Sequence, residues 1–83
     1  MTQTVSKERI EERVIELIAG FGPRREDLTR DANLEALDVD SLDLVELGQV
    51  AEEEFGVTLE TNDVLNIDTV GQAIDLVVDR AAL

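Results

Sequence analysis

The sequence predicts an all-α fold, a small bundle of three main helices plus one short helix, with a long loop between the first and second helices. Apolar residues recur at helical spacing in three segments, and no segment shows the strict alternation typical of a half-buried strand. Glycine, proline or capping residues mark the ends of these segments. With 83 residues and no internal repeat, the chain is expected to form one domain over residues 1–83.

The first helix is predicted from about Val5 to Ala19. We expect Gly20, Gly22 and Pro23 to end it, because glycine tolerates a left-handed C-terminal turn and proline cannot continue the hydrogen-bond ladder. Its apolar face holds Ile10, Val14, Leu17, Ile18 and Phe21.

From Pro23 to Asp40 the helical pattern lapses, and only Leu28, Leu34 and Leu37 recur as isolated apolar residues. A linker of this length without structure of its own is uncommon in a compact domain. We therefore expect these leucines to hold the segment as an ordered, functional loop.

The second helix is predicted from about Ser41 to Phe55, closed by Gly56. Leu42, Val45 and Gln49 fall outside its core face, which leaves two large apolar side chains near solvent at the helix start. A short helical turn is expected from Thr61 to Asn66, presenting Val64 and Leu65.

The last helix should begin at a capping box formed by Thr69 and Gln72, and should continue to about Ala81. Its apolar face is Val70, Ile74, Val77 and Val78. The core must be aliphatic, because Phe21 and Phe55 are the only aromatic residues. Outside the first helix it is predicted to contain Leu44, Leu47, Ala51, Leu59, Val64, Ile67, Ile74 and Val77.

The formal net charge is −13, and the stretch from Asp31 to Asp79 holds fourteen carboxylates and no Lys, Arg or His. Such a chain repels nucleic acid and anionic lipid, so basic proteins are the expected partners. There is no cysteine, and therefore no disulfide or thiolate metal site. The apolar runs are too short to cross a membrane and no signal peptide is visible, so a cytoplasmic protein is expected.

Neither catalysis nor a specific metal site is expected. A hydrolytic serine needs a base, and the chain has no histidine and no Gly-x-Ser-x-Gly elbow. A calcium loop starting at Asp38 requires Asp or Asn fifth, Gly sixth and Glu twelfth. The sequence has Leu42, Asp43 and Gln49 at those places.

Two interpretations of Ser41 remain open from physics alone. Serine and aspartate are common at helix starts, so Ser41 and its neighbours are explained equally well as a helix cap. The other interpretation is a site of modification. The flanking carboxylates, the outward Leu42 and Val45 and the long acidic face favour it.

Three segments carry a family resemblance: Asp40–Leu47, Glu52–Gly56 and Asp68–Val70. Together they resemble an acyl carrier protein of fatty acid or polyketide synthesis, over nearly the whole chain. The resemblance implies that Ser41 is esterified with the 4′-phosphopantetheine of coenzyme A by a phosphopantetheinyl transferase. The thiol of this arm then carries the acyl chain as a thioester, and the chain itself is not an enzyme.

The resemblance also implies partners: the transferase, an acyltransferase, a ketosynthase and other synthase enzymes with basic docking patches. Attraction between unlike charges speeds such encounters without demanding high affinity. A free-standing monomer is expected. The contact residues that we predict are Asp40, Leu42, Asp43, Val45, Glu46, Glu52 and Glu53.

Some residues depart from the family pattern. Asp38 follows Leu37 where relatives usually have glycine, and aspartate tolerates left-handed backbone better than most residues. Gln49 stands where fatty acid carriers are often apolar, and Gly48 weakens the helix. The alternatives are a peptidyl or aminoacyl carrier, and an unmodified acidic protein that would be indifferent to Ser41→Ala.

The charge alone yields a first prediction. With no cation between Arg30 and Arg80, the folded state suffers self-repulsion that counter-ions screen. Added salt or millimolar divalent cations should therefore raise the melting temperature, measured by circular dichroism. A melting temperature that responds to neither would contradict this prediction.

Overall fold

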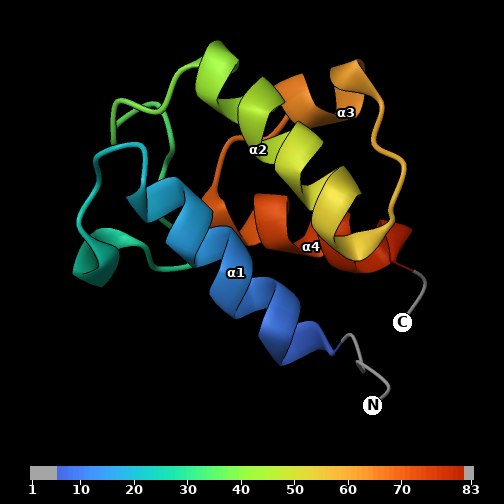
Figure 1. The fold of residues 1–83 in the computed structure, drawn as a ribbon. Coiled ribbons are helices and arrows are strands. Elements are labelled where there is room, and N and C mark those ends of the chain that lie inside the picture. Colours follow the sequence, from blue (N-terminus) through green and yellow to red (C-terminus); the bar gives the residue numbers. More distant parts are fainter. Residues whose placement is uncertain (1–5, 82–83) are drawn as a thin grey trace.

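The computed structural model describes residues 6–81, and within them the chain is all-helical, as predicted (Figure 1). The only β-type pairing in this part is an isolated bridge between Asn33 and Thr69. The elements in chain order are α1 (Lys7–Ala19), the 3₁₀ turn η1 (Arg25–Asp27), α2 (Ser41–Phe55), α3 (Thr61–Leu65) and α4 (Val70–Arg80).

The core forms where α1 packs on α4, with α2 lying across them and α3 beside α2 (Figure 1). Ile10, Val14 and Ile18 of α1 are fully buried, as are Val70 and Ile74 of α4. Burying each such side chain contributes about 1.5–3 kcal/mol. Most of the predicted core is confirmed. Two members, Leu59 and Ile67, are only half-buried and pack against the edge of the core.

The ends of α1 differ from the prediction. Val5 lies outside the described residues, and α1 begins at Lys7 because the Ser6 side chain accepts a hydrogen bond from the Arg9 N–H and caps the helix. At the other end Gly20 keeps right-handed backbone, so the predicted left-handed glycine is wrong there. The positive φ, 132°, falls at Gly22 instead.

The later helix ends follow the local sequence closely. Gly56 closes α2 in left-handed backbone with a φ of 67°, and Thr69 forms the predicted capping box with Gln72. The short helix α3 ends one residue earlier than predicted, with Asn66 as its C-cap. Likewise α4 ends at Arg80, with Ala81 as its C-cap.

The loop of residues 23–40 is ordered, as the isolated leucines predicted. Leu28 and Leu34 are buried, and Leu37 is half-buried against the core. Backbone hydrogen bonds tie the loop to the start of α4: Leu34 N–H donates to the Asp68 carbonyl at 2.9 Å, and Val70 N–H donates to the Ala32 carbonyl at 3.1 Å.

Gly71 permits this close approach, which sequence reasoning missed. Its N–H donates to the Arg30 carbonyl at 2.9 Å, and a Cβ at position 71 would lie 3.0 Å from that same oxygen. Any larger residue at position 71 would push the loop away from α4.

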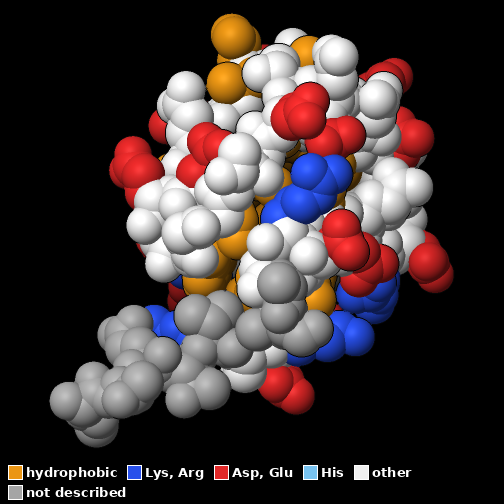
Figure 2. Space-filling view, turned by 90° about the vertical axis from the view of Figure 1, so that its right-hand side faces the viewer, with side chains coloured by type: hydrophobic (Ala, Val, Ile, Leu, Met, Phe, Trp, Pro, Cys, Tyr) orange, Lys and Arg blue, Asp and Glu red, His pale blue; other side chains and the backbone are white. Residues whose placement is uncertain are grey.

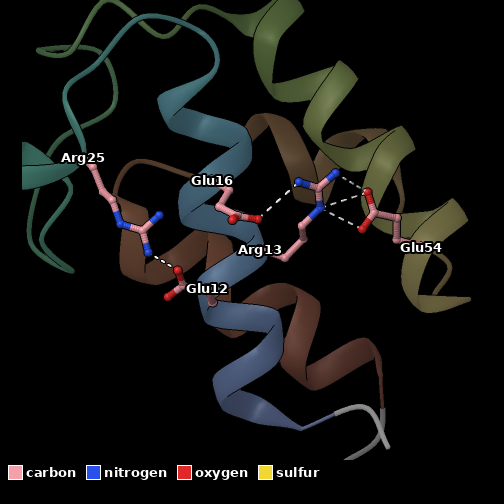
Figure 3. Close-up of polar contacts among 5 residues, drawn as sticks. All are labelled: Glu12, Arg13, Glu16, Arg25 and Glu54. Carbon is pink, nitrogen blue, oxygen red and sulfur yellow. Dashed lines mark hydrogen bonds and ion pairs between the residues drawn. The ribbon is translucent and has the colours of Figure 1, made fainter. Parts of the chain in front are cut away.

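Arginine side chains join elements that are distant in the sequence. Figure 3 shows Arg13 of α1 reaching Glu54 near the end of α2, with Nε–Oε1 and Nη2–Oε2 distances of 2.8 and 2.7 Å, while Glu16 contacts the same guanidinium. The hydrogen bonds from Arg13 lower the pKa of the Glu54 carboxyl, and the pKa of Arg13 is raised mainly by Glu54. Both groups therefore stay charged near neutral pH.

Further pairs secure the loop and α3. Arg25 of η1 pairs with Glu12 of α1 (Figure 3). Arg30 in the loop reaches Asp75 of α4 at 2.7 Å, and Asp75 raises the pKa of Arg30. Arg80 of α4 reaches Asp63 of α3 at 2.9 Å. Each pair is exposed and contributes little to stability alone, so its main effect is to position elements.

Candidate functional site

The candidate site lies at the start of α2, where a capping box uses two aspartates. The N-cap is Asp40, whose Oδ1 accepts a hydrogen bond from the Asp43 N–H at 2.9 Å. In return, Asp43 Oδ2 accepts one from the Asp40 N–H at 3.3 Å. The two carboxylates thus satisfy the donors that a helix start leaves open.

Ser41 is the first residue of α2, and it is exposed. Among the hydrogen bonds of residues 6–81, none involves its hydroxyl. Ser41 and Leu42 are the first two residues of α2, so their N–H groups have no partner within the helix. The segment from Asp40 to Asp43 therefore forms the helix cap that one interpretation expected, but Asp40 and Asp43 supply it and the Ser41 hydroxyl takes no part in it.

The end of the loop sets where Ser41 stands. Val39 is buried, and its N–H donates to the Leu34 carbonyl at 3.0 Å. Just before it, Asp38 adopts left-handed backbone with a φ of 64°, as its place in the family pattern suggested. The turn at Asp38 and the anchor at Val39 direct the chain into α2 with Ser41 at the surface.

A hollow of about 360 Å³ opens beside Ser41. The loop contributes Leu34 and Val39 to its wall, and the α3 side contributes Leu65 and Ile67. Leu65 is 44% exposed, so this hollow carries apolar surface close to the serine. Any group attached to the Ser41 hydroxyl would lie next to this hollow.

The exposed side of α2 carries a stripe of four residues, which we call the outward stripe: Leu42, Glu46, Gln49 and Glu53. They follow one another by four, three and four residues, which places them on one helix face. Leu42 is 77% exposed, the highest value for a large apolar residue in the described chain. The prediction that Leu42 stands in solvent is confirmed.

Other predicted contact residues have local roles. Val45 is half-buried beside α3, so the expectation that it lies near solvent is wrong. Glu52 turns toward the α2–α3 connection, where its Oε2 accepts a hydrogen bond from the Leu59 N–H at 2.9 Å. Asp40 and Asp43 serve the capping box. Of the predicted contact residues, three therefore lie on the outward stripe: Leu42, Glu46 and Glu53. The others also help to hold α2 in place: Asp40, Asp43, Val45 and Glu52.

Charge is unevenly distributed over the molecule. No Lys or Arg occurs in α2 or α3, whereas the described cations lie in α1, η1, the loop and the end of α4. On the face shown in Figure 2, acidic side chains are scattered over the upper part and the right-hand side, and basic side chains lie at the centre and lower down, some of them beside acidic ones. No helix among residues 6–81 has the length and apolar character needed to span a membrane.

Comparison with known proteins defines the class. Residues 12–77 match the family model described as a phosphopantetheine attachment site. The chain belongs to this family, whose domains carry a covalently attached 4′-phosphopantetheine.

The curated relatives narrow the class further. The chain is 38% identical over 80 residues to an acyl carrier protein of Saccharopolyspora erythraea, covering 94% of this chain and 84% of the relative. It is 36% identical over 78 residues to an acyl carrier protein of Petrotoga mobilis, covering 92% of each. A shorter match, 51% identical over 41 residues, joins 49% of this chain to 49% of an acyl carrier protein of Acidothermus cellulolyticus. The chain is therefore an acyl carrier protein, a carrier and not a catalyst.

The different roles of Asp40 and Ser41 at the start of α2 yield a second prediction. Asp40→Ala removes the cap and should lower the free energy of unfolding by about 1 kcal/mol. Ser41→Ala removes an unbonded, exposed hydroxyl and should change it by less than about 0.5 kcal/mol. Urea denaturation measures both values.

Asp40→Asn is the matched control, because asparagine also caps a helix but carries no charge. It should retain most of the stability that Asp40→Ala loses. Equal losses in Ser41→Ala and Asp40→Ala would show that the serine contributes to the cap after all.

Proposed function

We propose that Ser41 is the attachment point of the 4′-phosphopantetheine arm, and that the chain carries acyl intermediates as thioesters on this arm to enzymes of fatty acid or polyketide biosynthesis. The observation that carries the proposal is the unbonded, exposed hydroxyl of Ser41 beside a cap supplied entirely by Asp40 and Asp43. Ser41 also falls within the residues matched by the family model.

The surroundings of Ser41 fit a phosphodiester. The open N–H groups of Ser41 and Leu42 stand at the positive end of the α2 dipole, which favours an anion. The carboxylates of Asp40 and Asp43 oppose it, so the group stays in water and is not gripped. When bound, the arm supplies a thiol that holds the acyl chain. The chain's own residues supply an exposed hydroxyl on a rigid helix start.

In the modification step, the Ser41 oxygen attacks the phosphorus next to pantetheine in coenzyme A. A new Oγ–P bond forms as the pyrophosphate P–O bond breaks, and adenosine 3′,5′-bisphosphate leaves. The hydroxyl proton passes to a base of the transferase, because this chain has no histidine and Asp40 and Asp43 are engaged in the cap.

We further propose that partner enzymes dock on the outward stripe. Leu42 offers an apolar anchor, and Glu46 and Glu53 offer charges to a basic patch. Glu52, Asp40, Asp43 and Val45 border this surface, and they contribute mainly by holding the geometry of α2.

A mass measurement tests the attachment site. Incubation with coenzyme A and a broad-specificity phosphopantetheinyl transferase should add one phosphopantetheine to the intact protein, and none to Ser41→Ala. Ser6 is the only other serine in the chain, so Ser6→Ala is the matched control and should still be modified. A folded protein that gains no mass would favour the unmodified acidic protein instead.

A rate measurement tests the docking surface. Leu42→Ala should lower kcat/KM for phosphopantetheinyl transfer at least about fivefold, because an exposed apolar anchor contributes to binding and not to the core. Leu65→Ala removes the other exposed leucine and should have a much smaller effect.

The same assay compares charges. Glu53→Gln should slow transfer at low salt more than Glu60→Gln, which makes the same charge change in the α2–α3 connection. Docking on the outward stripe would be contradicted if Leu42→Ala slowed transfer no more than Leu65→Ala, and Glu53→Gln no more than Glu60→Gln.

A further inference from the structure

An open groove lies between the end of α1 and the middle of α2, separate from the hollow at Ser41. Its volume is about 280 Å³. Leu17 and Phe21 line it where α1 ends, and Val50 lines it on α2. A cavity of about 150 Å³ in another protein accepts benzene, so this groove has room for one leucine or phenylalanine side chain.

The apolar lining of the groove is only partly covered by the rest of the chain. Leu17 and Phe21 are half-buried and pack against the edge of the core. Val50 is also half-buried, but within residues 6–81 it is not one of the side chains that pack on the core. Apolar surface that gathers in one exposed place is typical of an interaction site.

Gly20 leaves one part of the groove without a side chain. It adopts right-handed backbone with a φ of −65°, which other residues also accept, so left-handed geometry does not explain the glycine. A Cβ at position 20 would have only two atoms within 4 Å, the carbonyl oxygens of Leu17 and Glu16. No atom of α2 approaches it, so the space above Gly20 is open.

The rim of the groove is acidic. Glu16 of α1 and Glu46 of α2 both line it, and both are exposed. Glu16 shares the guanidinium of Arg13 with Glu54, whereas no ion pair within residues 6–81 involves Glu46. An apolar centre bordered by carboxylates is complementary to an apolar side chain that is bordered by Lys or Arg.

The groove faces away from Ser41. Val50 follows Ser41 by nine residues, about two and a half helical turns, so the two side chains leave α2 in opposite directions. The small cavity between α2 and α3, lined by Gly48 and Val64, lies on the Ser41 side, because Gly48 follows Ser41 by about two turns. An arm attached to Ser41 therefore starts on the far side of α2 from the groove.

We propose that this groove is a second docking surface, which receives a leucine or phenylalanine side chain of a basic partner protein while Lys or Arg residues beside that side chain pair with Glu16 and Glu46. The groove shares Glu46 with the outward stripe, so the docking surface extends from α2 onto α1. A second copy of this chain is a poor occupant, because it also carries a net charge of −13. The inference does not depend on the attachment at Ser41.

The probe is an amphipathic helical peptide of about 14 residues, built only of leucine and lysine, which presents this chemistry. The isotope-labelled protein without an arm is titrated with the peptide at low salt, and methyl and amide chemical shifts locate the bound peptide. The largest shifts should fall on the methyls of Leu17 and Val50 and on the amide of Gly20. Absence of binding would overturn the proposal, as would shifts of Leu42 and Leu65 without shifts in the groove.

Two lysine substitutions assign the binding to the groove. Val50→Lys places a cation in it and should raise the Kd of the peptide about tenfold or more. Gln49→Lys is the matched control, because it adds the same charge at the preceding residue of α2, which does not line the groove. Circular dichroism verifies that both variants fold. If Gln49→Lys raises the Kd as much as Val50→Lys, the groove does not hold the peptide.

A second pair of variants tests the acidic rim. Glu16→Gln should raise the Kd more than Glu8→Gln, which makes the same charge change on α1 outside the groove. The difference should shrink at high salt, because counter-ions screen exposed charges. Equal losses in the two variants at low salt would contradict pairing at the rim.

The same spectra distinguish two other occupants. Groove shifts that depend on the concentration of the free protein would assign the groove to a second copy of the chain. Groove shifts caused by attaching a butyryl-phosphopantetheine arm to Ser41 would assign it to the cargo. Either result would overturn the proposal. A failure of Ser41 to accept the arm is a separate outcome, because the peptide titration uses the protein without an arm.

Discussion

The site depends on the contact between the 23–40 loop and the start of α4. The hydrogen bonds of Leu34, Val70 and Gly71 across this contact join backbone groups more than thirty residues apart. They pair backbone groups of the loop with those of the α4 start, and Leu28 and Leu34 of the loop are buried in the core. Because the loop is held there, its last residues arrive at a defined place and α2 begins with Ser41 at the surface.

The charged side chains also join segments that are distant in the sequence. Seven cations face twenty carboxylates. Arg13 of α1, Arg30 of the loop and Arg80 of α4 each reach a carboxylate on a different element. No Lys or Arg belongs to α2 itself, so Glu46 and Glu53 of the outward stripe add negative charge to that face of the helix, whereas α1, η1, the loop and the end of α4 carry the described cations.

A carrier has two requirements that compete, a firm helix start and a reactive serine on it. Here Asp40 and Asp43 cap the helix, and the hydroxyl of Ser41, the proposed attachment point, takes no part in the cap. Gly48 shows a similar compromise. It lowers the intrinsic stability of α2 by about 0.5–1 kcal/mol relative to alanine, yet it lets Val64 approach and leaves the small cavity beside it.

Local patterns in the sequence determined the helices, their caps and the candidate serine, since helical spacing, capping residues and turn glycines act within a few residues. They predicted α2 to the residue and the capping box of Thr69. Only the tertiary structure decided which carboxylates stand free. Glu52 and Glu53 are adjacent in the sequence, but the first bonds to Leu59 and the second faces solvent. It also decided why position 71 is glycine and where Val45 lies, because these depend on contacts between segments far apart in the chain.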